Sequence, residues 1–163
     1  MKSSVFNQSR DESRDEEFMA MAIELAREAA GDGETPVGCV ITYRGQVIGS
    51  GRNRRNTLKD PLAHAEMEAI RQASGFPGDW RVEECTMYVS LEPCPMCAGA
   101  IVQSRIPTCV MGAMNPKAGC AGSILNIPET PGFNHHCFLK KGVLEEESRQ
   151  VLQNFFSQLR NNI

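Results

Sequence analysis

The segment between residues 85 and 104 predicts a strand that passes almost directly into a helix. Cys85–Leu91 alternates and contains β-branched and aromatic side chains, which is typical of a strand. Pro95–Ser104 has proline in its first turn, where a helix loses no hydrogen bond through the missing N–H. Thr108–Gly112 predicts a further strand. Strand, helix and strand in this order favour a partly parallel sheet that is covered by helices.

Helices are also predicted at both ends of the chain and in its middle. Ser13 and Glu16 have the spacing of a capping box, and apolar residues at helical spacing follow them as far as Ala29. Ala63–Ala73 predicts a second helix. The last helix is predicted over Leu144–Leu159. Its side chains expected to face the core are Leu144, Val151, Leu152, Phe155, Phe156 and Leu159.

Two more strands and a long loop complete the predicted fold. A hairpin is expected where Val37–Tyr43 and Gln46–Ser50 flank Arg44-Gly45. Residues 114–142 are rich in Gly, Pro and Asn and predict a loop with one short strand. The fold class that follows is α/β, a three-layer α/β/α architecture with a central mixed five-stranded sheet. Such sheets bind ligands at the carboxyl ends of strands, where helices begin.

Length and composition limit the classes of protein to which the chain can belong. Its 163 residues predict one domain over residues 13–163, after a loose N-terminal segment at residues 1–12. A net charge of −3 argues against a protein that coats nucleic acid by charge alone. There is no secretory signal and no apolar run of ~20 residues, so we expect a cytoplasmic protein with no membrane partner. Seven cysteines cannot all pair within the chain, which favours free thiols or metal thiolates.

The residues best suited to chemistry lie at two of the predicted helix starts. Cys94 and Cys97 are spaced so that both sulfur atoms can reach one metal ion. The positive end of the helix favours their thiolate form. His64, at the other helix start, supplies a third ligand. Three protein ligands leave one position of a zinc tetrahedron open for water, which is typical of catalytic zinc sites.

Glu66 lies two residues after His64, in the first turn of the same helix. A carboxylate there can take a proton from the water and return it to the substrate, provided that it is not itself a ligand. Each feature alone has a simpler explanation, because a lone histidine is usually structural and C-x-x-C also occurs in redox pairs and zinc knuckles. A structural zinc site needs a fourth ligand, however, and the other five cysteines read mostly as small reduced side chains of the core.

These motifs resemble those of the cytidine and deoxycytidylate deaminase superfamily over residues 17–160. The combination H-x-E with P-C-x-x-C is the signature of zinc deaminases that act on bases. The resemblance is carried by residues 34–38, 51–54, 60–66, 91–100, 104–106 and 131–135. Pro131–His135 and the Phe155-Phe156 ending are most similar to the members that act on tRNA. The resemblance implies a cytidine deaminase-like fold, one Zn²⁺ per chain, and a homodimer that binds a tRNA anticodon stem-loop and hydrolyses its wobble adenosine to inosine.

The resemblance also implies a role for particular residues. His64, Cys94 and Cys97 are expected to hold the zinc, and Glu66 is expected to move the proton. The substrate-binding residues that it implies are Val37, Asn53, Ala65, Asn115, Lys117, Asn134 and His135. Asn53 is expected to hydrogen-bond the flipped nucleoside, with the last three near neighbouring nucleotides. The family commonly has an acidic residue where this chain has Asn115.

An RNA substrate needs positive charge near the site, although the chain is acidic overall. Residues 52–59 contain four basic residues and no acid, so this loop is expected to attract phosphate, with a merely solvated loop as the alternative. Two other functions stay open. One is a deaminase of a free base or nucleotide, such as guanine, cytosine or deoxycytidylate. The other is a non-enzymatic zinc- or RNA-binding module, which would have no use for Glu66.

Overall fold

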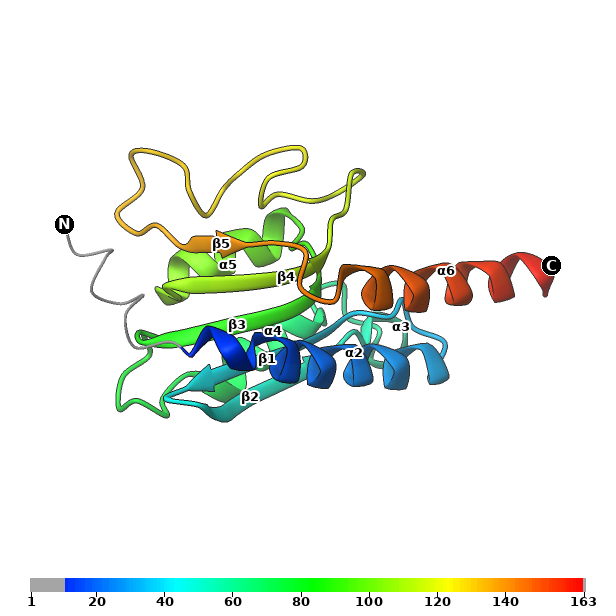
Figure 1. The fold of residues 1–163 in the computed structure, drawn as a ribbon, viewed down its shortest axis with the longest axis horizontal. Coiled ribbons are helices and arrows are strands. Elements are labelled where there is room, and N and C mark those ends of the chain that lie inside the picture. Colours follow the sequence, from blue (N-terminus) through cyan, green and yellow to red (C-terminus); the bar gives the residue numbers. More distant parts are fainter. Residues whose placement is uncertain (1–10, 163) are drawn as a thin grey trace.

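Helices pack on both faces of a five-stranded sheet in the computed structural model, which describes residues 11–162 (Figure 1). In chain order the elements are η2 (Glu12–Arg14), α2 (Asp15–Gly31), β1 (Gly38–Tyr43), β2 (Gln46–Arg52), α3 (Arg55–Leu58), α4 (Ala65–Ala73), β3 (Cys85–Leu91), α5 (Pro95–Ser104), β4 (Thr108–Ala113), β5 (Phe138–Lys140) and α6 (Glu145–Asn161). The predicted three-layer architecture is confirmed. Most of the predicted loose N-terminal segment, residues 1–10, lies outside the described residues.

The sheet is mixed, as the sequence predicts. Its strand order is β2-β1-β3-β4-β5; β1 is antiparallel to β2 and β3, whereas β3, β4 and β5 are parallel. Arg44 and Gly45 join β1 to β2 with positive φ angles of 50° and 79°, as a two-residue hairpin turn requires. Because β3 and β4 are parallel, their carboxyl ends lie at the same edge of the sheet. Helix α5 begins at that edge, directly after β3.

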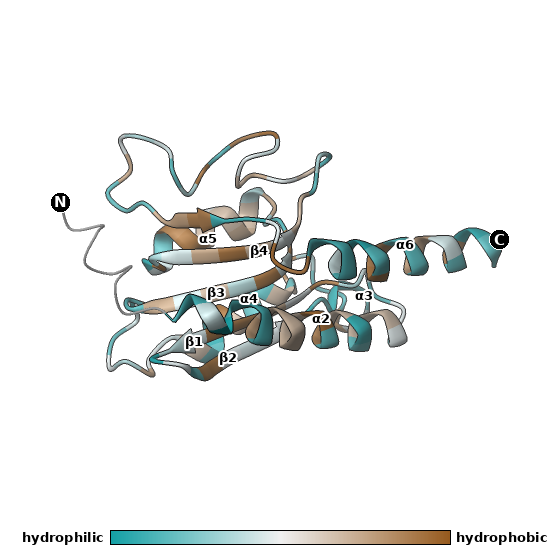
Figure 2. Ribbon diagram, in the orientation of Figure 1, coloured by the Kyte–Doolittle hydropathy of each residue, from teal (hydrophilic) through white to brown (hydrophobic). Residues whose placement is uncertain are grey.

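Each face of the sheet has its own hydrophobic core. Helices α2 and α6 cover one face, where Tyr88 of β3 packs with Phe18 and Val151. Helices α4 and α5 cover the other, where Met87 of the same strand packs with Ile101. Neighbouring residues of β3 thus point into opposite cores, as the pleat of a strand dictates. Figure 2 shows hydrophobic residues along β3 and β4 and mostly hydrophilic ones along α6. In the described part of the chain, no helix is both long and apolar enough to cross a membrane.

The start of α2 differs from the predicted capping box. Ser13 lies inside the short helix η2, and the Asp11 carboxylate accepts a hydrogen bond from the Ser13 backbone N–H at 3.0 Å. The N-cap residue of α2 is Arg14, whose side chain makes no capping hydrogen bond. The prediction was therefore wrong in both the position and the residue of the cap. Asp11, rather than Ser13, is the residue whose side chain accepts from a free N–H group at the start of this helical segment.

The final helix is less buried than its apolar residues predict. Val151 and Phe155 are buried, but Phe156 and Leu159 are 43% and 47% exposed. The prediction that the last two face the core is wrong. The physical reason is length, because the C-terminal half of α6 extends beyond the sheet, where there is no second layer to cover it (Figure 1).

Gly38 allows α2 to lie unusually close to β1. A Cβ atom at this position would overlap the carbonyl oxygen of Ala22, which belongs to helix backbone and cannot rotate away. We expect Gly38→Ala to lower the free energy of unfolding by about 3 kcal/mol, measured by urea denaturation. Gly99→Ala is the matched control, because a Cβ there meets no atom within 4 Å and alanine favours a helix. Equal stability of the two variants would contradict the close contact.

Candidate zinc and catalytic site

The side chains of His64, Cys94 and Cys97 converge at the edge of the sheet where β3 ends. His64 is the N-cap residue of α4, Cys94 is the N-cap residue of α5, and Cys97 lies in the first turn of α5. The His64 Nδ1 atom is 3.5 Å from the Cys94 sulfur and 3.6 Å from the Cys97 sulfur. The three atoms lie within 4.8 Å of one another, and no other such cluster of His, Cys, Asp or Glu occurs among residues 11–162.

The geometry of this cluster fits a tetrahedral zinc ion. Zinc bonds of about 2.3 Å to sulfur and about 2.0–2.1 Å to nitrogen, at tetrahedral angles, separate the two atoms by about 3.6 Å. The observed nitrogen-to-sulfur distances have this value. The cluster can therefore hold one zinc ion with three protein ligands. The other five cysteines are buried free thiols outside the cluster, as predicted for reduced side chains.

The two thiols of the cluster have very different pKa values. The Cys97 thiol donates a hydrogen bond to Cys94, and His64 lies beside it, so the pKa of Cys94 falls to about 4. The pKa of Cys97 is correspondingly raised, because its proton is held by Cys94 and the side chain is buried. Cys94 is thus a ready thiolate, which is the form of cysteine that binds metal.

Glu66 is buried next to the cluster. It lies in the first turn of α4 and is 4% exposed. Burial raises its pKa to about 7, and the negative charge of Cys94 acts in the same direction. Its carboxyl group lies beside the Cys97 side chain. A carboxyl group whose pKa lies near neutrality can both take and give a proton, which is the property that a general base and acid needs.

Three of the predicted substrate-binding residues come together beside the cluster. Ala65 follows His64 and is fully buried in the hydrophobic core beneath α4 and α5. Val37 is half-buried and packs against that core. The Asn53 backbone N–H donates to the Val37 carbonyl at 3.2 Å. The Asn53 amide donates to Thr35 and its oxygen accepts from the Arg55 backbone N–H. The strand ends and these hydrogen bonds hold the Asn53 side chain in one orientation.

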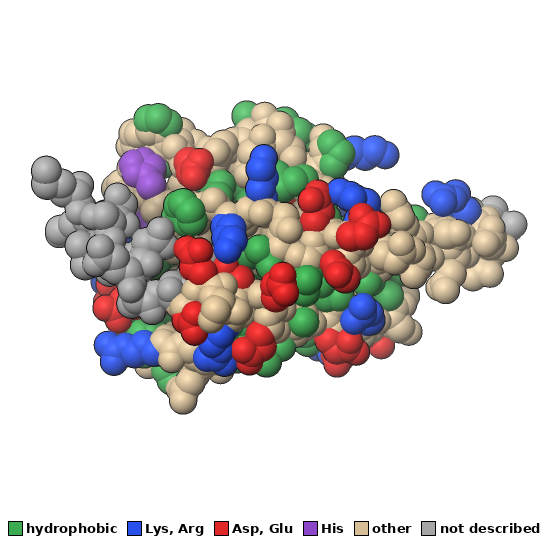
Figure 3. Space-filling model, viewed as in Figure 1, with side chains coloured by type: hydrophobic (Ala, Val, Ile, Leu, Met, Phe, Trp, Pro, Cys, Tyr) green, Lys and Arg blue, Asp and Glu red, His purple; other side chains and the backbone are tan. Residues whose placement is uncertain are grey.

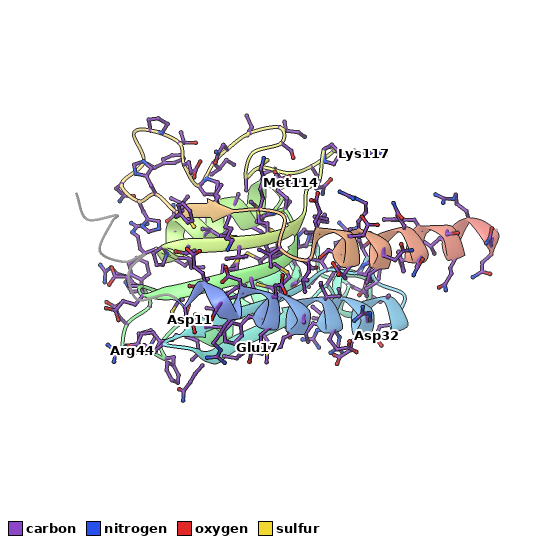
Figure 4. All side chains as sticks on the ribbon, in the orientation of Figure 1. Asp11, Glu17, Asp32, Arg44, Met114 and Lys117 are labelled. Atoms are coloured by element: carbon purple, nitrogen blue, oxygen red, sulfur yellow. The ribbon has the colours of Figure 1, made fainter. Side chains whose placement is uncertain are left out.

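Asn115 and Lys117 lie on the loop that leaves β4 at the same edge of the sheet. The Asn115 side-chain oxygen accepts from the backbone N–H groups of Lys117 and Ala118 at 3.2 and 3.3 Å, which folds the loop into a tight turn. Lys117 is exposed and lies at the turn, whereas Met114 lies nearer to the strand (Figure 4). A positive side chain is thus presented to solvent on the side of the sheet edge where the metal cluster lies.

Asn134 and His135 lie at the opposite edge of the sheet. The His135 Nε2 atom is 2.7 Å from the carbonyl oxygen of Ile106, which precedes β4. A strand of six residues separates that end of β4 from the carboxyl end, a distance of about 20 Å. The structure therefore does not bring these two residues to the metal cluster. A substrate that contacts both the metal cluster and these two residues must extend along the loop after β4.

Two buried carboxylates complete the surroundings of the site, although the sequence reasoning gave them no role. Glu34 is fully buried and accepts from the backbone N–H groups of Asn56 and Thr57 at 3.0 and 2.9 Å, which holds the short helix α3. Glu92 is buried directly before the cysteine motif. The only sign of these two residues in the sequence is that Glu34 and Glu92 each lie in a segment that carries the family resemblance, residues 34–38 and 91–100. The partners lie 22 or more residues away and are not visible in the sequence.

The basic loop between residues 52 and 59 is less positive than its composition predicts. Arg54 lies 2.7 Å from Glu68, and Arg52 lies 3.0 Å from Glu28 and 3.3 Å from Asp32. Arg55 and Lys59 have no ion pair within the part of the chain that the structure describes. On the face formed by α2 and α6, acidic and basic side chains are mixed (Figure 3).

Comparison with known proteins agrees with this fold and this site. Residues 12–113 match the model of the cytidine and deoxycytidylate deaminase zinc-binding region. The chain therefore belongs to this family of zinc-binding deaminases, and the predicted cytidine deaminase-like fold is confirmed.

Particular relatives narrow the relationship. The chain is 46% identical to the tRNA-specific adenosine deaminase of Bacillus subtilis (strain 168), over 90% of this chain and 91% of that protein. A solved structure from work on A-to-I editing by tRNA:A34 deaminases superimposes with a TM-score of 0.79 at 38% identity, and covers 83% of this chain and 99% of its own. A guanine deaminase of Nitrosomonas europaea superimposes with a TM-score of 0.70 over 87% of this chain and 84% of its own. Its 23% identity shows the shared fold alone. Within the family, the chain groups with the tRNA-specific adenosine deaminases.

Proposed function

We propose that this protein hydrolyses the wobble adenosine of a tRNA anticodon to inosine, in the cytoplasm and as a homodimer. One observation carries the proposal most directly. A His-Cys-Cys cluster with zinc geometry lies beside a buried glutamate. The chain that holds it is 46% identical to a tRNA-specific adenosine deaminase over nearly its whole length.

The chemistry follows from the positions of the side chains. When bound, zinc supplies a Lewis acid that lowers the pKa of water, so that the water can lose a proton near neutral pH. Glu66 takes a proton from the water that adds to C6 of adenine and delivers it to N1. The C6 centre becomes tetrahedral, the proton of the hydroxyl group added at C6 passes through Glu66 to the exocyclic amine, and ammonia leaves as the C6 carbonyl forms. Each proton that Glu66 accepts is returned, so the side chain is regenerated.

The roles of the substrate-side residues are those that the resemblance to the deaminase family implies. Asn53, held by Thr35 and Arg55, hydrogen-bonds the flipped nucleoside, and Val37 and Ala65 line the base pocket. Asn115 lies near the target nucleotide, and Lys117 contacts a neighbouring phosphate. Asn134 and His135 contact RNA farther along the loop. An anticodon loop suits such a site, because its bases are already partly unstacked and cost little to extrude.

An assay on two kinds of substrate tests the proposal. Purified zinc-loaded protein is incubated with an anticodon stem-loop that carries adenosine at the wobble position, and separately with free guanine and free cytosine. We expect inosine in the RNA, detected by nucleoside analysis, and no ammonia from the free bases. Ammonia from a free base alone would instead favour a free-base deaminase. Fully bound zinc with no turnover of any substrate would favour a binding module.

A further inference from the structure

The carboxylate of Glu92 lies at the centre of the loop that follows β4. Its Oε1 atom accepts from the Asn115 backbone N–H at 2.9 Å, and its Oε2 atom accepts from the N–H groups of Ala121 and Ser123 at 3.0 and 2.9 Å. The Ser123 hydroxyl donates a fourth hydrogen bond to Oε1. One side chain thus accepts hydrogen bonds from both ends of the segment between residues 115 and 123.

Two neighbouring residues, Cys120 and Gly119, also bring the loop close to Glu92. The Cys120 backbone N–H donates to the carbonyl oxygen of Pro93 at 2.8 Å, which joins the same two segments a second time. A Cβ atom on Gly119 would overlap the Glu92 carboxyl group, so the loop approaches the carboxylate as closely as its backbone allows. Glu92 is only 2% exposed. A carboxylate this deeply buried is stable only where hydrogen bonds replace its water, and this loop supplies them.

Glu92 also lies between the two halves of the site. It precedes the predicted zinc ligand Cys94 by two residues, at the end of β3. The loop that it holds carries Asn115 and Lys117, which the proposed function places against the RNA. The carboxylate of Glu92, together with the hydrogen bond between Cys120 and Pro93, therefore sets the distance between the metal ligands and these substrate-side residues.

We propose that Glu92 is a positioning residue for the substrate: it fixes the loop after β4 relative to the zinc ligands. The role rests on the proposed function, since it assumes that this loop contacts the RNA. The four hydrogen bonds that its carboxylate accepts all come from residues 115–123, so Glu92 acts through the loop.

The test variant is Glu92→Gln. A glutamine amide replaces one carboxylate oxygen by an NH2 group, which in either orientation faces at least one backbone N–H group and cannot accept its hydrogen bond. We expect zinc to stay at one ion per chain and the Michaelis constant for the anticodon stem-loop to rise about tenfold or more, with a smaller change in kcat. Hydrogen exchange at the amides of Asn115, Ala121 and Ser123 should become faster, while that of β3 stays unchanged. Ser123→Ala removes one of the four bonds and should change the same quantities in the same direction by less.

Glu83→Gln is the matched control, because Glu83 is an exposed glutamate in the loop before β3. It should leave all three measurements at the wild-type values. Unchanged loop exchange in Glu92→Gln, an unchanged Michaelis constant despite faster exchange, or loss of zinc would each overturn the proposal. A wild-type enzyme without activity on the RNA would contradict the proposed function instead. Hydrogen exchange needs no substrate and would still decide whether Glu92 holds the loop.

Discussion

We expect Glu66→Ala to lower kcat on the anticodon stem-loop by about 10³-fold or more, while zinc stays at one ion per chain. The side chain is the buried carboxylate next to the cluster, and its pKa of about 7 suits both halves of a proton transfer. General acid and base groups contribute typically about 10² to 10⁴ to a rate. A residue that serves twice in one turnover belongs at the upper end of that range. Alanine removes the carboxylate and leaves His64, Cys94 and Cys97 in place.

Rapid-quench kinetics and elemental analysis of the same preparation measure the two quantities together. Arg71→Ala is a suitable control, because Arg71 lies on the same helix with its side chain exposed. That variant should keep both wild-type turnover and wild-type zinc. If Glu66→Ala lost its zinc, Glu66 would be a ligand and its assignment as the proton carrier would be wrong.

The elements that the sequence predicts best are those whose local signals agree. Cys85–Leu91 and Pro95–Ser104 have the predicted bounds in the structure. The first alternates and is rich in strand-forming residues, and the second has proline in its first turn and a polar end. Gly45 similarly marks the hairpin, because glycine readily adopts the positive φ angle of 79° that the turn requires there. The cluster of His64, Cys94 and Cys97 was predictable for a related reason: both motifs lie at helix starts, and helix starts lie at one edge of such a sheet.

The features that escaped prediction depend on contacts between distant residues. Nothing near Glu34 in the sequence shows that it caps α3, whose amides lie 22 and 23 residues away. The charged partners of Arg52 and Arg54 come from α2 and α4, so the basic loop is partly neutralised only in the folded chain. The exposure of Phe156 depends on where the sheet ends, and a helical pattern carries no such information.

The second large effect is expected from the metal ligands. We expect Cys97→Ala to weaken zinc binding by more than about 100-fold, which exceeds the loss typical for an outer-shell partner of a ligand. Elemental analysis after dialysis should then show far less than one zinc per chain, and turnover of the RNA should fall with it. Cys97 supplies one of the three ligand atoms, and no fourth His, Cys, Asp or Glu belongs to the cluster among the residues that the structure describes.

A second buried cysteine separates the loss of a ligand from the loss of packing. Cys109 is fully buried in β4, as Cys97 is in α5, but it lies outside the cluster. Cys109→Ala removes the same sulfur atom from a buried position. It should lower the free energy of unfolding by about 1 kcal/mol, with zinc content and turnover unchanged. If both variants lost zinc equally, general loosening of the core would explain the effect. If neither lost zinc, Cys97 would not be a ligand. Retention of zinc in Cys109→Ala alone assigns the metal to the cluster at the two helix starts, because the two substitutions differ only in where the sulfur lies.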